Sequence, residues 1–142
     1  MKYGDVMKEI LKLTFIASIM GMLYLLIELL YKGYTYWQMA LIGGLAGMLT
    51  GYTNSILKWK LPLWLQGMLG MVIATVCEFV GGYYFNLCKH YSIWDYSNLP
   101  FNFHGQICLY YSIAWFFLSI LCIFLYNGIR IIVFGESKQE NK

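Results

Sequence analysis

The chain has 142 residues, of which 60% are hydrophobic and 12% are charged, and its formal net charge is +3. Soluble domains have about 45–50% apolar and about 25% charged residues, so this composition excludes an ordinary soluble globule. It also excludes intrinsic disorder, which requires low hydrophobicity and high net charge. The composition therefore predicts an integral membrane protein with one domain, residues 1–142.

Four apolar stretches are each long enough to cross a hydrocarbon core about 30 Å thick, which takes roughly 20 helical residues. Their continuous apolar character favours helices over barrel strands, which alternate apolar and polar residues. We expect an all-α bundle of four transmembrane helices with a long loop over residues 88–106. The expected spans are residues 11–30, 37–57, 63–87 and 107–134.

Positive charges indicate the orientation, because Lys and Arg concentrate in cytoplasmic segments. On one side of the expected spans lie Lys2, Lys8, Lys12, Lys58, Lys60, Arg130, Lys138 and Lys142. On the opposite side are Lys32 and Lys89 alone. We therefore expect both termini in the cytoplasm of a bacterial cell and the 88–106 loop outside. Lysines dispersed at membrane edges also predict that the chain binds no nucleic acid.

Glycines recur at four-residue steps in the second and third expected spans. They are Gly43, Gly47 and Gly51 in the second span, and Gly70 and Gly82 in the third. Such spacing lets helix backbones approach closely inside a membrane. The pattern fits packing within one chain, and it fits equally a seam in a homo-oligomer or with a membrane-protein partner.

Two carboxylates, Glu28 and Glu78, lie within expected spans. An ionisable residue near the middle of a membrane costs about 2.5–3.5 kcal/mol on insertion scales, so it normally faces the bundle interior or a water cavity. Both fall in the outer halves of helices that run in the same direction. We expect them to converge on an outward-opening site that binds a cation or exchanges protons, with Tyr24 and Tyr31 beside Glu28. A simple interfacial position is the alternative for Glu28.

The 88–106 loop is rich in aromatic and amide side chains. It is expected to cover the mouth of the bundle, either as a structural cap or as a lid that contacts a ligand. The polar and aromatic candidates for such contact are Trp94, Asp95, Asn102 and His104. Cys88 and Cys108 flank the loop, and we expect the four cysteines to be unlinked, with no zinc site and no cofactor. A Cys88–Cys108 disulfide in an oxidising exterior is the alternative.

Nucleotide-binding and hydrolase motifs are absent from the sequence, including the P-loop pattern and the GxSxG, HExxH and CxxC patterns. The chain is therefore expected not to be an enzyme, although a membrane-embedded enzyme that uses scattered carboxylates is an alternative. Any use of ATP would require a separate ATPase partner.

A family resemblance is carried by residues 94–109, which read WDYSNLPFNFHGQICL. This stretch resembles the signature W-D-Y-S-x-x-P-F-N-x-x-G-x-I-C-L of small bacterial membrane proteins described as "putative ABC-transporter type IV", or CmpB-like. The resemblance implies a permease-like transport component, and an accessory or assembly subunit of a larger complex is the alternative. The family usually has arginine after the glycine, where this chain has Gln106.

Overall fold

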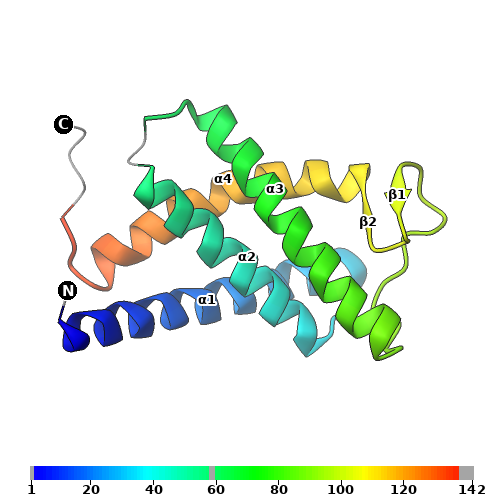
Figure 1. The fold of residues 1–142 in the computed structure, drawn as a ribbon, viewed down its shortest axis with the longest axis horizontal. Coiled ribbons are helices and arrows are strands. Elements are labelled where there is room, and N and C mark those ends of the chain that lie inside the picture. Colours follow the sequence, from blue (N-terminus) through cyan, green and yellow to red (C-terminus); the bar gives the residue numbers. More distant parts are fainter. Residues whose placement is uncertain (1, 58–59, 138–142) are drawn as a thin grey trace.

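The computed structural model describes residues 2–57 and 60–137, and in this part of the chain it is built from four long helices (Figure 1). A short π-helix extends the third of them, and two strands of two residues pair antiparallel before the fourth. In chain order, the elements are α1 (Tyr3–Lys32), α2 (Trp37–Ile56), α3 (Leu63–Gly82), η1 (Tyr83–Cys88), β1 (Asn102–Phe103), β2 (Ile107–Cys108) and α4 (Leu109–Ile132). The all-α prediction is confirmed apart from this hairpin.

Helix ends follow local sequence signals. The α1 helix ends at Lys32 and is capped by Gly33, which adopts a left-handed conformation (φ +81°) and donates its backbone N–H to the Leu29 carbonyl at 2.8 Å. Glycine suits this position because it has no Cβ to clash. Pro62 directly precedes α3, where its lack of an N–H costs nothing.

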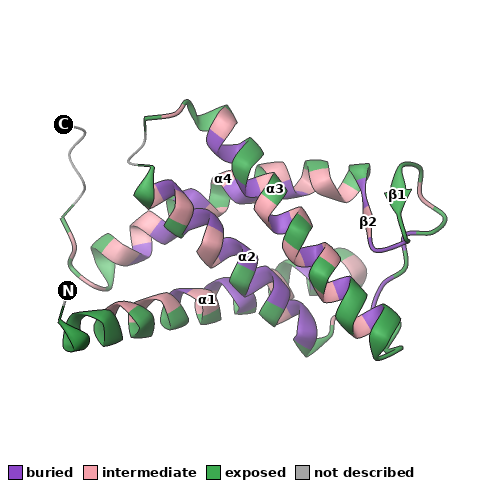
Figure 2. Ribbon diagram, viewed as in Figure 1, coloured by how far each residue is buried: buried purple, intermediate pink, exposed green. Residues whose placement is uncertain are grey.

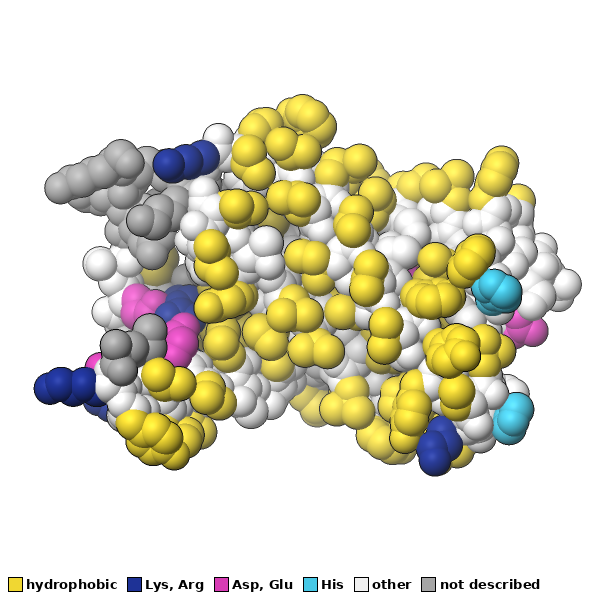
Figure 3. Space-filling model, in the orientation of Figure 1, with side chains coloured by type: hydrophobic (Ala, Val, Ile, Leu, Met, Phe, Trp, Pro, Cys, Tyr) yellow, Lys and Arg dark blue, Asp and Glu magenta, His cyan; other side chains and the backbone are white. Residues whose placement is uncertain are grey.

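Three helical segments are long and apolar enough to cross a membrane, namely α1, α3 with η1, and α4. Figure 3 shows apolar side chains over the middle of the visible face, with charged side chains near its two ends. The expected second span forms α2, which does not meet the same apolar standard because it carries four glycines and several amide and hydroxyl side chains. Three of the four expected spans therefore coincide with helices of membrane-spanning character.

The α2 helix lies at the centre of the bundle and packs against all three other long helices (Figures 1 and 2). Ten of its twenty residues are buried. Close approach of α1 depends on missing side chains, because a Cβ on Gly21 would lie 2.5 Å from the Ala40 carbonyl oxygen of α2. Gly44 of α2 lies equally tightly against the α1 backbone at Ala17. The low apolar content of α2 is thus matched by burial among its neighbours.

The predicted packing glycines all lie at contacts within the chain. Each glycine and the side chain that a Cβ there would strike are as follows: Gly43 and Tyr24, Gly47 and Met20, Gly51 and Tyr126, Gly70 and Ser119, Gly82 and Trp94. Intrachain packing therefore accounts for both glycine patterns, and these faces are not free for another copy of the chain.

The start of α1 and the end of α4 lie at one end of the bundle, together with the end of α2 and the start of α3 (Figure 1). This end is called the terminal end below. The opposite end, called the loop end, carries residues 33–36 between α1 and α2, and residues 89–106 between η1 and β2. Of the expected cytoplasmic lysines, Lys58, Lys138 and Lys142 fall outside the described residues.

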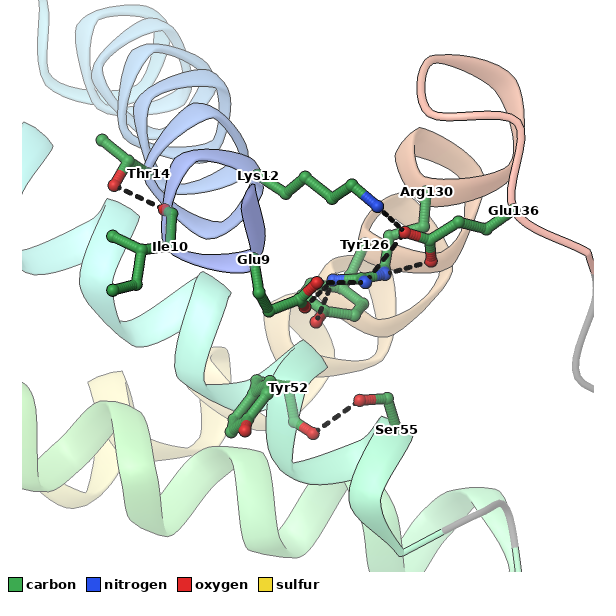
Figure 4. Close-up of polar contacts among 9 residues, drawn as sticks. All are labelled: Glu9, Ile10, Lys12, Thr14, Tyr52, Ser55, Tyr126, Arg130 and Glu136. Carbon is green, nitrogen blue, oxygen red and sulfur yellow. Dashed lines mark hydrogen bonds and ion pairs between the residues drawn. The ribbon is translucent and has the colours of Figure 1, made fainter. Parts of the chain in front are cut away.

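A cluster of ion pairs joins α1 to α4 at the terminal end (Figure 4). The Arg130 guanidinium binds the Glu9 carboxylate at 2.7 and 3.1 Å, and it binds Glu136 at 2.6 and 2.9 Å. Lys12 donates to Glu136 at 2.6 Å. Burial raises the pKa of Glu136, but the hydrogen bonds from Arg130 and Lys12 outweigh it and hold this pKa below its usual range. Two cations and two carboxylates thus neutralise one another where the start of α1 approaches the end of α4.

Candidate functional site

Glu78 is the most enclosed acidic side chain in the described part of the protein, with 2% of its surface exposed. It lies on the face of α3 that also carries Gly70 and Ala74, and this face packs against α2 and α4. Its Oε1 accepts a hydrogen bond from the Tyr96 hydroxyl at 2.7 Å, and its Oε2 accepts one from the Trp115 indole N–H at 3.1 Å. Among the described residues no cation forms an ion pair with Glu78.

The two donors to Glu78 were not singled out from the sequence. Tyr96 belongs to the loop but is 7% exposed, because the loop folds inward and stacks its ring on Tyr111 with centroids 4.7 Å apart. Trp115 is the one tryptophan of α4. Its position within an apolar span was a usable signal, since a buried indole N–H requires an acceptor. Neither signal identifies Glu78 as the partner.

Glu28 is also buried, at 6% exposure, near the C-terminal end of α1. Its Oε1 pairs with the Lys32 ammonium at 2.9 Å, and its Oε2 accepts a hydrogen bond from the Thr35 hydroxyl at 2.6 Å. The four-residue spacing of Glu28 and Lys32 was visible in the sequence as a helical ion pair. The contact with Thr35 depends on the chain turning back after Gly33.

Tyr24 connects the two acidic positions. Its ring stacks on Trp115 with centroids 5.3 Å apart and planes 21° apart. On α1 it lies one helical turn before Glu28, and its stacking partner Trp115 donates to Glu78. The structure therefore brings Glu28, Glu78 and Tyr24 into one region of the bundle, on its loop-end side, where the Trp115 indole links Tyr24 to Glu78.

The polar loop candidates lie apart from this cluster. Asp95 is exposed, and its carboxylate accepts hydrogen bonds from the hydroxyl and the backbone N–H of Ser97, which lower its pKa. Asn102 donates to the Leu99 carbonyl at 2.8 Å and accepts from the Gly105 N–H at 3.1 Å. These side chains close turns of the loop itself, and neither of them hydrogen-bonds Glu28 or Glu78.

The remaining candidates also contact neither carboxylate. His104 is exposed, has a left-handed backbone (φ +52°) and packs its ring edge-on against Phe103. Tyr31 is 64% exposed, on the outer side of α1. Trp94 is buried, but its indole N–H donates to the Gln106 carbonyl at 2.9 Å, which makes it an anchor of the loop.

A family model described as "Putative ABC-transporter type IV" matches residues 12–139. The chain belongs to this family. The matched region includes Glu28, Glu78 and the entire 88–106 loop. No curated protein and no solved structure matches the chain. Membership identifies a membrane protein related to ABC transporters, and it assigns no substrate.

Gln106 stabilises the inward fold of the loop. Its Oε1 accepts a hydrogen bond from the Asn86 amide at 2.9 Å, and the Asn86 carbonyl oxygen accepts the Ile93 backbone N–H at 2.7 Å. Gln106 does not bind a spanning carboxylate. In this member of the family, the hydrogen-bond donors to the Glu78 carboxylate are therefore two neutral groups, the Tyr96 hydroxyl and the Trp115 indole N–H.

No cysteine or histidine hydrogen-bonds Glu28 or Glu78 among the described residues. All four cysteines are free, including Cys88 and Cys108 on either side of the loop. Within residues 2–57 and 60–137, no group of three or more His, Cys, Asp or Glu side chains is arranged to hold a metal ion. The chemistry that the described site offers is that of two carboxyl groups, one ammonium and an aromatic stack.

Proposed function

We propose that this protein is a small transport component of the bacterial cytoplasmic membrane, in which Glu78 exchanges a proton or binds a cation. One observation carries the proposal: a carboxyl group with 2% exposure is held by two neutral donors inside a bundle of apolar helices. Acidic residues at such positions are costly and commonly belong to ion or proton pathways. Family membership supports a role in transport.

The proposed topology has four spans, namely the three apolar helices and α2, and both termini in the cytoplasm. The α2 helix has the same length as α3, 20 residues, and runs between the same two ends of the bundle. Its glycines and its buried polar side chains, Gln38, Thr50 and Asn54, face other helices, so lipid does not meet them. The terminal end carries more of the basic residues, which favours the cytoplasmic side for that end.

Within the site, Glu78 is the carboxyl that remains available for charge exchange. Lys32 neutralises Glu28 through an ion pair, whereas Glu78 is contacted only by neutral groups among the described residues. A proton or cation that reaches Glu78 from the loop end replaces the hydrogen bond from Tyr96. Because Tyr96 is carried by the 89–106 segment, this segment acts as the lid of the site, and movement of Tyr96 exposes Glu78.

The proposal includes two kinds of protein partner, a separate ATPase chain and a neighbour within the membrane. The sequence contains no P-loop, so a transporter of this family that uses ATP needs a separate ATPase chain. An oligomer or a membrane partner would have to use surfaces other than the two glycine faces, since these are occupied within the chain.

Flux measurements in liposomes test the role of Glu78. The purified protein is reconstituted, an electrical potential is imposed with potassium and valinomycin, and internal acidification is followed with a trapped dye. We expect Glu78→Gln to reduce the protein-dependent proton flux about tenfold or more, because the amide cannot release a proton. Asp5→Asn is the matched control, since Asp5 is an exposed carboxylate at the opposite end of the bundle.

Far-UV circular dichroism and gel filtration must show that Glu78→Gln is folded. Glu28→Gln is a second variant, expected to have a smaller effect because its carboxylate is already paired with Lys32. Equal flux in the wild type, Glu78→Gln and Asp5→Asn would refute the role assigned to Glu78. Flux no higher than in empty liposomes for the wild type would refute proton exchange altogether.

A further inference from the structure

An apolar groove of about 680 Å³ lies between α1 and α4. The two helices meet near the terminal end, where Ile16 and Met20 pack with Tyr126 and Ile129. Beyond that contact α1 presents Leu23 and Ile27 to the groove, and α4 presents Leu118 and Leu125. Several lining residues are exposed, among them Leu26 at 51% and Leu121 at 62%. Because these helices have membrane-spanning character, the groove opens toward lipid.

The inner wall of the groove is the aromatic pair of Tyr24 and Trp115, with Gly43 of α2 beside it. Gly43 leaves room for the Tyr24 ring, which a Cβ there would strike at 2.5 Å. The faces of Trp and Tyr rings attract cations, and this attraction is strongest where water is excluded. The edge of the same indole ring donates to Glu78. A ligand on this wall therefore lies one aromatic ring away from a carboxyl group.

The net charge behind the aromatic wall of Tyr24 and Trp115 is negative. Glu28 and Glu78 supply two carboxylates, and Lys32 supplies one ammonium, which leaves one negative charge when both carboxyls are ionised. Coulomb attraction from this charge is stronger in an apolar groove than in water. A neutral lipid chain gains nothing from the carboxyl groups, and a hydrated inorganic ion finds no polar ligands along the lining.

We propose that this groove binds a lipophilic organic cation that enters from the bilayer. The class of ligand follows from an apolar lining, an aromatic wall and a carboxyl group behind that wall. The volume falls within the roughly 300–1,000 Å³ of sites for drug-sized molecules. The inference rests on the proposed function, since the cation neutralises Glu78 in place of a proton and thereby becomes the transported substrate.

Binding of tetraphenylphosphonium tests this inference, with neutral triphenylphosphine oxide as the comparison probe. Equilibrium dialysis of the purified protein in detergent measures both, with empty micelles subtracted. Gly128→Phe places an aromatic ring in the groove that Gly128 lines, at a position where a Cβ meets nothing within 4 Å. Ile113→Phe places the same side chain elsewhere on the exposed surface of α4 and serves as control.

We expect the wild type and Ile113→Phe to bind the cation equally and to prefer it to the neutral probe. Gly128→Phe should weaken cation binding roughly tenfold or more, because the ring occupies the groove. Glu78→Gln should weaken cation binding by a similar factor and leave binding of the neutral probe unchanged. Unaltered cation affinity in a folded Gly128→Phe protein would overturn the proposal.

Three other results would also overturn it. One is equal affinity for the two probes, which indicates a groove that only accommodates lipid tails. Another is a co-purified phospholipid, or a second copy of the chain, that native mass spectrometry detects and that the cation does not displace. The third is unchanged cation binding in a folded Glu78→Gln protein. Proton flux that depends on Glu78 without groove binding would overturn this inference and leave the proposed function standing. Cation binding that depends on Glu78 without proton flux would refute proton exchange and leave cation binding, and this inference, standing.

Discussion

Replacing Tyr96 with phenylalanine isolates the hydrogen bond that joins the loop to Glu78. The substitution removes the hydroxyl that lies 2.7 Å from Glu78 Oε1 and keeps the ring. The ring retains its stacking on Tyr111, with centroids 4.7 Å apart, and its packing near Trp94. The difference between Tyr96→Phe and the wild type therefore reports on one polar contact.

The magnitude follows from burial. Tyr96 and Glu78 are 7% and 2% exposed, so water does not replace the lost donor. A hydrogen bond to a charged group contributes about 1.5–3 kcal/mol, and an acceptor left unpaired in a buried site costs a similar amount. We expect the free energy of unfolding to fall by about 2 kcal/mol and the melting temperature to fall by roughly 5 °C.

Unfolding of the detergent-solubilised protein, followed by tryptophan fluorescence, measures this change. The matched control is Tyr83→Phe, which removes the hydroxyl of a 55% exposed tyrosine in η1. A surface change of this kind normally alters the free energy of unfolding by no more than about 0.5 kcal/mol. If Tyr96→Phe is as stable as Tyr83→Phe, the loop does not hold Glu78 through this hydroxyl and the lid mechanism fails.

Two further predictions concern the helix packing and the ion pairs of the terminal end. Gly21→Ala should destabilise the fold by about 1–3 kcal/mol because its Cβ would lie 2.5 Å from a carbonyl oxygen of α2, whereas Gly128→Ala should stabilise it by up to about 1 kcal/mol. The same unfolding assay checks both, and equal stability of the two variants would contradict the close contact of α1 with α2. Glu136 has a lowered pKa in the folded protein, so its contribution is present above the unfolded value of about 4.3 and is lost as the pH falls through the lower folded value. The melting temperature of Glu136→Gln should therefore lie below that of the wild type at pH 7, with a smaller difference at pH 3; a difference that does not depend on pH would argue against the ion pair with Arg130.

The apolar stretches of the sequence located the four long helices, but they did not define every helix boundary. The first span was expected from residue 11, whereas α1 begins at Tyr3. Hydropathy marks the part of a helix that lipid covers, while backbone hydrogen bonds continue through polar residues such as Lys8 and Glu9. The reverse holds for α2, which is a full helix with weak hydropathy because its neighbours, and not lipid, cover most of its surface.

Glu28 and Glu78 were predictable from sequence because a carboxyl group within an apolar run stands out in one dimension and carries a known cost in a membrane. Their partners were less accessible. Asp95 has the more obvious functional chemistry, yet Tyr96 next to it enters the bundle, because successive side chains of an extended loop point in different directions. Only the packed loop decides which of the two points inward.

The low charge and the apolar runs of this sequence determined by themselves that the protein is a helical membrane protein with acidic residues inside it. These properties depend on side-chain composition and on spacing along one helix, which the sequence states directly. Tertiary structure decided that α2 is central, that the glycines pack within the chain, and that Tyr96 and Trp115 hold Glu78. Those contacts join segments far apart in the chain, and their distances depend on how closely the helices approach one another.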